Sequence, residues 1–595
     1  MTNKIYTVIT FAPVQGFIEK SRKLRDLYGS SYLLSYISWV ICNAAQKHGC
    51  TVVSPASINV TQGMPNQIII EGNFPENEAK SVLLKGWKCI TESCREWIET
   101  NVEVIEGEKI DYTPWRRTWG LWTKYAWEFF WVQGEKEDSI SKVREKLNEK
   151  KRRRDWTGIN WQGESSTLSG ADAIAYPKLG LISDPRKYNY QQEKKDVTAF
   201  YQALSEKLGE SFIDLTPRLN FSGDEKIKRS KEYGESFIDP DEELSLPELI
   251  KRLITHKAIA IKIKENFNKT FEDSEIFQDL EILSEDLNPQ SFTDLNRLKK
   301  IKLINDNKQL EQQKFFQGWF QGDGDKAGEY LKKFPHKTHD FSKEMRDWGK
   351  WFKNKSLKFG RVIYAGGDDF LGVFFDREDE KEKLKPSYCV NWFEDFKSKI
   401  WHENKTTKEE QKKITVSVGF VWAFPDIPQR DVLQNCREAE KSAKNNGRDR
   451  IAFRILFNNG NHLEWVCPWW LLEKGLLSGY RDRDKNESKV EQNWTHIYND
   501  VAVLESRHAF DDDGLDVALG LFEIYFPDYV DEIKNEQKLL HLNDANLTEV
   551  SAGILGEQRM YYQENLEELD QIKINKALTN WIVNLAKVGF HLCQQ

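Results

Sequence analysis

A glycine turn that ends in two aspartates, between two apolar segments, is the feature that most constrains the fold of this chain. Residues 364–370 read YAGGDDF, and the flanking segments 361–365 and 370–375 are predicted to be the strands of a hairpin. A third apolar segment upstream, 315–322, runs into Asp323, Gly324 and Asp325. In a βαββ unit the first strand and the hairpin strands can lie side by side, so we expect these carboxylates at one end of one sheet.

The apolar pattern around the turn predicts an element order of βαββαβ with an added helix and strand. The expected strands are 315–322, 361–365, 370–375, 414–422 and 451–457, and the expected helices begin near 326 and span 388–401 and 431–445. The N-terminal part predicts a similar order, with strands at 4–12, 51–53, 67–71 and 125–132 and helical segments up to 46 and at 75–100. The two units indicate an α+β fold with a weak internal duplication of element order.

The remaining sequence is predicted to be mainly helical. Between the two units the chain is charged, and its polar stretches 191–196 and 223–243 are expected to be loops. From His462 to the end the pattern is helical, including 494–505 and 575–590. We therefore expect four domains, at 1–137, 138–310, 311–460 and 461–595.

Composition limits the class of protein. The 595 residues are 39% hydrophobic and 30% charged, which excludes fibrous and extensively disordered chains. The net charge is 86 − 94 = −8, so any contact with RNA or DNA must be local. Eight sparse cysteines in apolar segments are typical of reduced core thiols, and neither a signal layout nor a membrane span is evident. We expect a cytoplasmic protein without membrane contact.

The acidic strand ends are suited to metal-assisted phosphoryl chemistry. Carboxylates on rigid strand ends can hold Mg²⁺ or Mn²⁺ ions that bridge a nucleoside triphosphate, and paired glycines let the backbone approach phosphates. The same turn is also an ordinary hairpin signal. A calcium loop starting at Asp323 is excluded, because Ala327 and Phe334 occupy positions that need oxygen ligands.

A second candidate group lies downstream, where 439–450 reads AEKSAKNNGRDR. Lys444 and Arg448 are near the expected C-terminal end of a helix, where cations complement the helix dipole. They could equally bind a triphosphate, and the spacing does not decide between the two.

Four passages resemble one family in its order along the chain: FIEKSRKLRDLYGSSYLLSYIS at 17–38, DGDKAG at 323–328, YAGGDDF at 364–370, and SVGF with AKNNGRDR between 417 and 450. The chain resembles the large subunit of type III CRISPR effector complexes, the Cas10 family, in its Cmr-like branch. The resemblance implies two ferredoxin-like palm domains of the nucleotide cyclase and polymerase type. A helical connector with a degenerate zinc knuckle and a helical C-terminal domain are implied with them.

The resemblance also implies a function in antiviral defence. The second palm domain would convert ATP into cyclic oligoadenylate second messengers when the complex holds target RNA. Its expected partners are crRNA, target RNA and the backbone and small subunits of the complex. Carried over to this sequence, Asp323, Asp368 and Asp369 would be catalytic and bind metal, and Asp325 would be a further metal ligand. The triphosphate would contact the following residues: Gly324, Gly366, Gly367, Lys444 and Arg448.

The first palm domain is predicted to lack the metal site. Its first strand ends in FAPVQG at 11–16 and its expected hairpin is QGMPN at 62–66, with no carboxylate in either. It is expected to form part of a pocket for the acceptor ATP. The nearby RKLRDLYGSS, 22–31, could belong to that pocket or could be a helix-packing signature.

Two departures from the family restrict the expected activity. No histidine-aspartate nuclease domain precedes the first strand, and the one His-Asp dipeptide, His339-Asp340, is predicted to start a helix, so DNA cleavage is not expected. Where relatives have the cysteines of a zinc knuckle, this chain has Ser166 and Ser169, so no zinc is expected.

Other functions stay open. The chain could be a non-catalytic scaffold and target-sensing subunit of the same complex. A diguanylate cyclase would fit the hairpin but not the first-palm passage. The basic runs 150–154 and 226–231 could touch RNA or another subunit, or be solvated.

Overall fold

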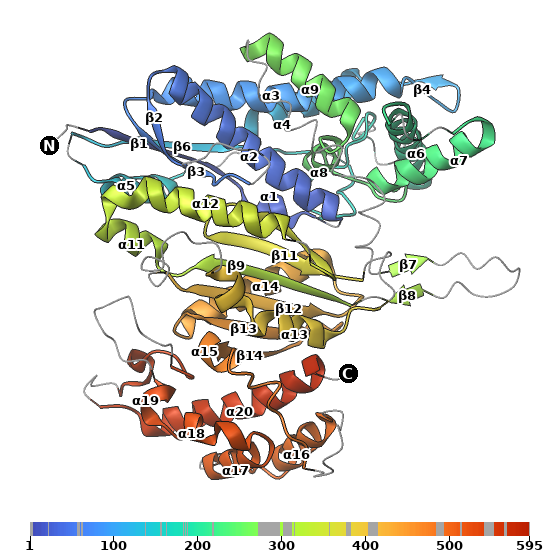
Figure 1. Cartoon of the computed structure of the whole chain (residues 1–595). Helices are drawn as coiled ribbons and strands as arrows, with labels where there is room; N and C mark the ends of the chain where they lie inside the picture. The colour runs from blue at the N-terminus through green and yellow to red at the C-terminus, as the bar shows by residue number, and fades with distance from the viewer. Residues whose placement is uncertain are drawn as a thin grey trace, which may run out of the picture. The chain divides into compact units, whose positions relative to one another are not determined.

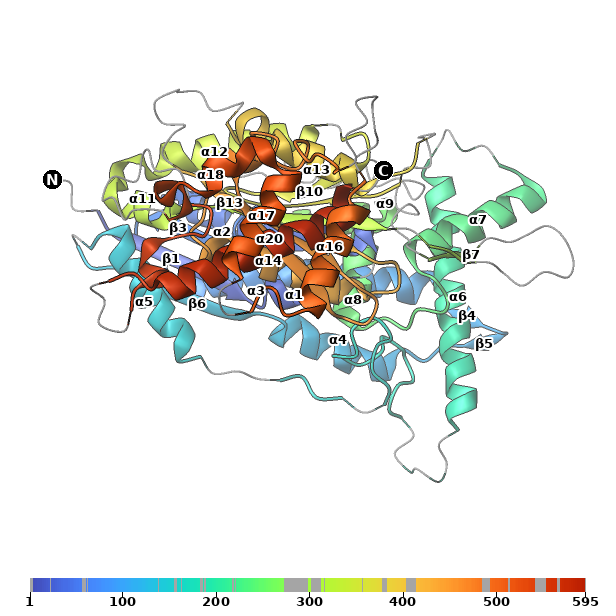
Figure 2. The same ribbon diagram turned by 90° about the horizontal axis from the view of Figure 1, so that it is seen from below.

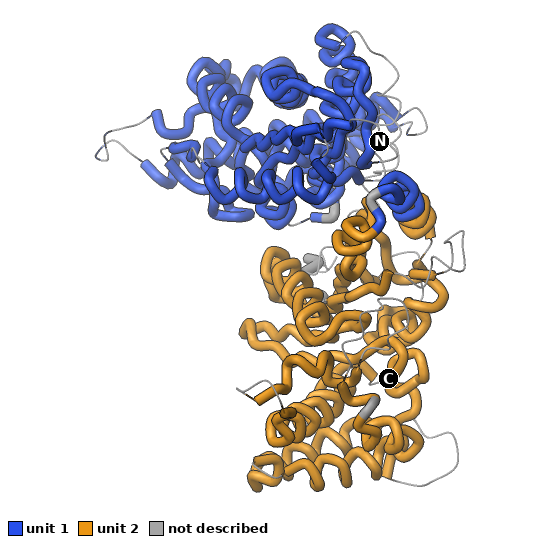
Figure 3. The backbone as a smooth tube through the Cα atoms, turned by 90° about the vertical axis from the view of Figure 1, so that its left-hand side faces the viewer, with its two compact units in different colours: residues 1–296, 334–346 blue, residues 297–333, 347–595 orange. Residues whose placement is uncertain are grey.

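The computed structural model divides into two compact units, coloured separately in Figure 3. Unit 1 comprises residues 1–296 and 334–346, and unit 2 comprises 297–333 and 347–595. The structure describes the chain except for the following residues: 1–3, 22, 56–59, 61–62, 137, 155–157, 162, 182–183, 185, 187–188, 217–218, 220, 272–297, 301–311, 315, 356, 377–381, 403–413, 484–492, 512–513, 541–552, 564–567 and 594–595.

Unit 1 is built on a four-stranded antiparallel sheet with the strand order β2-β3-β1-β6. The strands are β1 (Tyr6–Ala12), β2 (Thr51–Ser54), β3 (Gln67–Glu71) and β6 (Glu128–Gln133), and β4 (Val104–Ile105) pairs separately with β5 (Glu108–Lys109). The helices are α1 (Gln15–Glu19), α2 (Leu24–Lys47), α3 (Glu76–Asn101), α4 (Thr113–Tyr125), α5 (Ile140–Arg152), α6 (Tyr190–Asp214), α7 (Gly223–Phe237), α8 (Leu246–Leu253) and α9 (Lys257–Phe271). The predicted βαββαβ order is confirmed, with β4, β5 and α4 inserted before the last strand.

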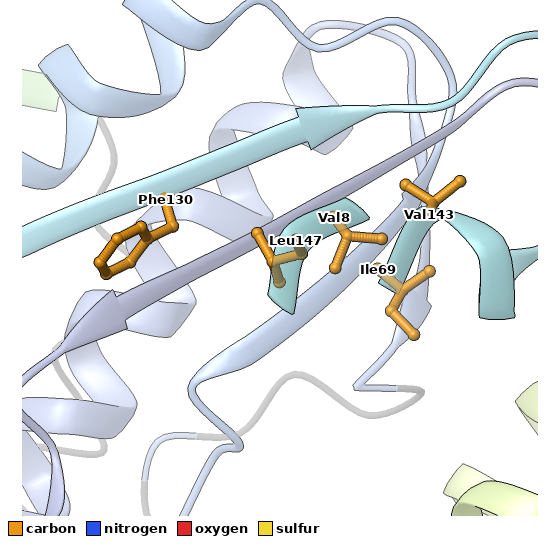
Figure 4. Close-up of a cluster of buried hydrophobic side chains, with 5 residues drawn as sticks. All are labelled: Val8, Ile69, Phe130, Val143 and Leu147. Carbon is orange, nitrogen blue, oxygen red and sulfur yellow. The ribbon is translucent and has the colours of Figure 1, made fainter. Parts of the chain in front are cut away.

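Alternation along the strands gives this sheet two covered faces. Val8, Ile69 and Phe130 project from three neighbouring strands toward Val143 and Leu147 of α5, and the five side chains form a buried cluster (Figure 4). Helices α2 and α3 lie on the opposite side of the sheet (Figure 1). The apolar periods of 2 and 3.6 residues thus produce one layered α+β unit.

The passage at the start of α2 packs against α8. Arg25 is fully buried and donates to Thr255 Oγ1 at 2.8 Å, and Asp26 Oδ1 accepts from Arg252 Nε at 2.7 Å. A Cβ on Gly29 would lie 2.0 Å from the Lys251 carbonyl oxygen, so the two backbones meet where only glycine fits. These contacts favour the helix-packing interpretation of the passage.

The expectation of loops at 191–196 and 223–243 is wrong. Residues 191–196 begin the 25-residue helix α6, and most of the second stretch is α7, which packs beside α6 (Figure 2). The polar residues 191–196 form the exposed or half-exposed first turns of α6. Residues further along the helix, such as Phe200 and Leu204, are buried. Tertiary packing therefore outweighed the polar local composition.

Unit 2 contains a six-stranded sheet with the strand order β10-β11-β9-β12-β13-β14, in which only β12 and β13 are parallel. The strands are β9 (Gln317–Gly324), β10 (Gly360–Ala365), β11 (Asp369–Phe374), β12 (Val416–Ala423), β13 (Arg450–Leu456) and β14 (His462–Pro468), and β7 (Leu298–Lys300) pairs separately with β8 (Gln312–Lys314). The five strands predicted for this unit are present within a few residues of their expected bounds.

Helices cover both faces of this sheet. They are α11 (Ala327–Lys333), α12 (Thr338–Asn354, whose residues fall in both units), α13 (Pro386–Glu394), α14 (Gln429–Asn445) and α15 (Trp469–Leu472), with short helical turns at Pro335–Lys337 and Lys397–Trp401. On one face α14 packs against β12, where a Cβ on Gly419 would lie 2.2 Å from the Glu440 amide nitrogen. On the other face an aromatic cluster includes Phe320, Phe370 and Trp392. As predicted, His339 and Asp340 lie in the first turn of α12.

The C-terminal part of unit 2 is helical, as expected, except at its start. Its elements are α16 (Thr495–Ser506), α17 (Leu515–Tyr525), α18 (Val530–Ile533), α19 (Glu536–Leu539) and α20 (Gln571–Cys593), with turns at Pro527–Tyr529 and Gln558–Tyr561. The helical expectation is wrong for 462–468, which form the edge strand β14 because Trp465 and Cys467 pack inward against the sheet and α20. Among the described residues, no helix is both long and apolar enough to cross a bilayer.

The close approach at Gly29 yields a stability prediction. Gly29→Ala should lower the stability of unit 1 by about 1–3 kcal/mol, because the added methyl group overlaps the Lys251 carbonyl. Thermal unfolding of the full chain measures the shift. Gly120→Ala in α4 is the control, since nothing lies within 4 Å of the place that its added Cβ would take, and it should be neutral or slightly stabilising. Equal effects of the two substitutions would contradict the packing argument.

Candidate active site at the end of the second sheet

The antiparallel pairing of β9 with β11 brings the predicted acids together. Asp323 lies directly opposite Asp369 in the ladder, and the Gly324 N–H donates to the Asp368 carbonyl at 2.9 Å. The turn is closed by the Gly366 N–H, which donates to the Asp369 carbonyl at 3.2 Å. The expected juxtaposition of the first strand with the hairpin is thus confirmed, while the roles of the residues stay predictions.

The glycines leave space around these carboxylates. A Cβ on Gly324 would lie 2.9 Å from Asp368 Cβ, which explains the glycine between Asp323 and Asp325 at the end of β9. A Cβ on Gly367 would meet only Asp369 Oδ1, at 3.9 Å. The backbone of the turn is therefore open to an approaching group.

Mutual repulsion makes the acids reluctant to ionise together. Loss of hydration, then repulsion by Asp323 and Asp369, raises the pKa of Asp368 to about 7. The crowded neighbours of Asp369, which take away part of its hydration, and repulsion by Asp323 raise its pKa to about 6. A cation at this position would relieve the repulsion, so the carboxylates suit a divalent metal ion in their chemistry.

Lys444 supplies a positive charge at the same place. Its ammonium group pairs with Asp323 and, at 2.6 Å, with Glu440 Oε1 one turn earlier on α14. Burial lowers the pKa of Lys444, but the two carboxylates outweigh it and raise the pKa above its usual value. The structure therefore brings two predicted site residues, Lys444 and Asp323, into contact. Lys444 also lies in the last turn of α14, where a cation complements the helix dipole, and the two roles are compatible.

Glu440 is a site residue that the sequence analysis missed. It is nearly buried and accepts from Gln321 Nε2 at 3.2 Å, and burial raises its pKa. Its spacing of four residues before Lys444, on the same helix face, is the signal that could have identified it.

Asp325 has a different environment from the other acids. It is buried, and its carboxylate accepts from Ser417 Oγ at 2.6 Å, Thr415 Oγ1 at 2.8 Å and the Asp449 N–H at 3.0 Å. Burial raises its pKa in spite of these bonds. Both carboxylate oxygens are thus engaged by the protein, and metal binding by Asp325 stays a prediction that these contacts do not favour.

Arg448 lies in the turn between α14 and β13. Its guanidinium is 3.7 Å from Glu557 Oε1, and its backbone N–H donates to the Ala443 carbonyl at 3.2 Å. Arg448, which is predicted to contact phosphate, therefore has its ionic partner in the C-terminal region, at Glu557.

Two further predicted sites have simple surroundings. At the end of β1 in unit 1, Thr10 Oγ1 accepts from Asn66 Nδ2 at 3.2 Å; of the expected hairpin 62–66, Gln62 lies outside the described residues. Ser166 and Ser169 lie with their hydroxyls 3.3 Å apart, and Ser166 donates to Glu248.

Across the described part of the chain, no three histidine, cysteine or acidic side chains are already arranged around a metal position.

A mainly antiparallel sheet of this order with acids where β9 ends and β11 begins is typical of a palm domain of the nucleotide cyclase and polymerase type. Residues 316–452 match the family model described as Cas10/Cmr2, second palm domain, and residues 6–92 match CRISPR-associated protein Cmr2, N-terminal. Both models describe domains of Cas10/Cmr2 proteins, and these two parts of the chain are similar to them.

Several solved structures are similar to the chain. A subunit of the type III-B Cmr-beta complex in its apo state is 13% identical, with 98% of this chain and 82% of that chain covered and a TM-score of 0.49. The Csm1-Csm4 cassette in complex with cA4 gives 13% identity, coverage of 100% and 70%, and a TM-score of 0.40. The Csm1-Csm4 cassette in complex with one ATP is 13% identical. The match covers 100% of this chain and 70% of that chain, with a TM-score of 0.39. No curated protein matches the chain.

The raised pKa values predict how the site affects stability. A group whose pKa is higher in the folded chain stabilises the fold at acidic pH and loses that contribution as the pH rises through its folded value, here about 7 for Asp368. Asp368→Asn should therefore raise the unfolding temperature of the metal-free chain at pH 8 by about 1–3 °C, with a smaller gain at pH 5.

Metal addition and a control substitution complete this test. Mg²⁺ or Mn²⁺ should raise the unfolding temperature of the unsubstituted chain more than that of Asp368→Asn, because the ion stabilises only a fold that binds it. Asp395 is exposed and paired with Lys399, so Asp395→Asn is the control. Its unfolding temperature should match that of the unsubstituted chain at both pH values and should rise as much when metal is added. A pH-independent difference between Asp368→Asn and the unsubstituted chain would contradict the assignment.

Proposed function

We propose that this chain, within a crRNA-guided type III complex, converts ATP into cyclic oligoadenylates when target RNA is bound. The observation that carries the proposal is the placement of Asp323 opposite Asp369 on adjacent strands, with Lys444 in contact with Asp323. The matches of two parts of the chain to Cas10/Cmr2 domain models support crRNA, target RNA and the other subunits as partners. The four-domain division given above belongs to the same proposal.

In this proposal Asp323, Asp368 and Asp369 hold divalent metal ions. When bound, such ions neutralise charge on the triphosphate and lower the pKa of the attacking hydroxyl. The 3′-hydroxyl of one ATP forms a bond to the α-phosphorus of another, the bond from that phosphorus to the bridging oxygen breaks, and pyrophosphate leaves with that oxygen. The hydroxyl proton passes to solvent. The chain's own part is to bind and align the two nucleotides.

The cations and glycines of the site bind the triphosphate. Lys444 would bind a phosphate oxygen in place of Asp323 if the acids held metal ions, and Glu440 would keep its ammonium group in place. The open backbone at Gly367 leaves room for the phosphates, and Gly366 and Gly324 lie on either side of the same strand ends. Arg448 adds a second positive charge from the turn before β13.

The chemistry predicts a complete loss of product without two of the acids. The complex, assembled with guide and complementary target RNA, should form cyclic oligoadenylates from ATP with Mg²⁺ or Mn²⁺. The Asp368→Ala, Asp369→Ala double variant should make at least about 10³-fold less, because the charge of the triphosphate is no longer neutralised. Mass analysis of the nucleotides measures the product.

The controls separate catalysis from assembly and from base choice. Asp395→Ala, an exposed acid of the same unit, should retain full activity, and all variants should bind target RNA equally. GTP in place of ATP should give no product, which distinguishes the synthetase from a diguanylate cyclase. Product from the double variant at the unsubstituted rate would refute the assignment of the acids.

The second candidate function is a scaffold and target-sensing subunit whose palm domain does no chemistry. The observation that favours it is the ion pair of Lys444 with Asp323, which already satisfies one of the acids. Metal-dependent ATP binding by the purified chain separates the two functions. A scaffold should bind no ATP whether or not metal is added, whereas the synthetase should bind it only with metal.

A further inference from the structure

The turn that carries Arg448 has an unusual backbone. Gly447, Arg448 and Asp449 have φ angles of +111°, +63° and +50° in succession. Two of the three are not glycine, and a left-handed conformation costs such residues roughly 1 kcal/mol or more each. The turn therefore needs contacts from elsewhere to hold it.

One set of contacts comes from the palm sheet. The Asp325 carboxylate accepts from the Asp449 N–H at 3.0 Å, and Lys397 Nζ donates to Asp449 Oδ2 at 2.7 Å. These bonds fix the last residue of the turn, and the Arg448 N–H bond to the Ala443 carbonyl ties its middle residue to the end of α14.

The other set comes from the C-terminal segment 553–557. The Arg450 guanidinium donates to three carbonyl oxygens: to Gly553 at 2.7 Å, to Ile554 at 3.1 Å and to Arg448 at 2.9 Å. One side chain thus joins the segment to the turn. The backbones also touch, since a Cβ on Gly447 would lie 2.8 Å from Gly556 Cα.

The chemistry of Arg450 indicates that its contacts with the turn and with the segment 553–557 have a specific role. Its side chain is fully buried, and its three hydrogen bonds all go to neutral carbonyls rather than to a carboxylate. Burying a cation without a directly bonded acid is unfavourable, and the burial lowers the pKa of Arg450 to about 10. A buried guanidinium of this kind is expected where the backbone segments that it joins must be held in a fixed position.

We propose that Arg450 is a positioning residue for nucleotide binding: it anchors the turn 447–449 to the segment 553–557 and so presents Arg448 to the triphosphate. The proposal rests on the proposed function, because Arg448 matters only if the site binds a nucleotide. It gives the C-terminal region a part in setting the affinity of the palm domain for ATP. Glu557, 3.7 Å from the Arg448 guanidinium, belongs to the same segment and steadies the side chain.

The test compares two equivalent substitutions on one strand. Arg450→Lys keeps the charge but cannot reach all three carbonyls, so KM for ATP should rise about 5- to 10-fold with kcat within about twofold in the assembled complex. Arg454→Lys is the control: Arg454 is also nearly buried in β13, but it bonds Glu464, Glu438 and Asn435 instead of the turn. It should leave KM unchanged.

Two further measurements show whether Arg450 acts through Arg448. In an Arg448→Ala background, Arg450→Lys should raise KM no further, since the group that it positions is gone. Hydrogen exchange of the full chain should show faster exchange of the amides of residues 446–449 in Arg450→Lys and not in Arg454→Lys. Exchange is measured without nucleotide, so it also detects a variant that has simply failed to fold.

Each outcome decides something. If the unsubstituted chain binds no ATP with metal, the proposed function fails and the inference with it. If it binds ATP but Arg450→Lys leaves KM or the exchange of the turn unchanged, the positioning role is overturned and the proposed function stands. A fall in kcat at constant KM, matched by Arg454→Lys, would show a merely structural contribution and would also overturn it.

Discussion

The pairing of β9 with β11 is the interaction on which the candidate site depends. It sets Asp323 opposite Asp369, and a slip of one residue would turn the β9 aspartate to the other face of the sheet. The same register places Phe370 opposite Gly322, where a Cβ would lie 2.2 Å from the Phe370 ring. Because the ring occupies the space that the glycine leaves, apolar packing in the core fixes the register that aligns the polar strand ends.

The charge balance at these strand ends is uneven. Four carboxylates, those of Asp323, Asp368, Asp369 and Glu440, feel the charge of one ammonium group, that of Lys444, which pairs directly with Asp323 and Glu440. A structural ion pair needs only one acid for each cation, so the excess of acids is unfavourable for a purely structural cluster. It is the arrangement expected of a site completed by divalent cations, and this supports the synthetase over the scaffold.

Much of the fold could be predicted because its strands are continuous apolar runs. The hairpin around 364–370 and the strand before Asp323 were predicted nearly to their ends, and so was their adjacency. Elements governed by distant packing were not: α6 begins with polar residues, and β14 is a strand because it covers the edge of β13. Local patterns record which face of an element is buried but not which neighbour buries it.

The same distinction applies inside the site. Asp323 and Asp325 are two residues apart and were indistinguishable in the sequence, yet Asp325 bonds two hydroxyls and the Asp449 N–H behind the strand end. Ser417 and Asp449 are about 90 and 120 residues away in the chain, so no local signal could have separated the two acids. One aspartate faces Lys444 and the other supports the turn that carries Arg448. Their different partners therefore divide the two strand-end acids between the acidic cluster and the turn that carries Arg448.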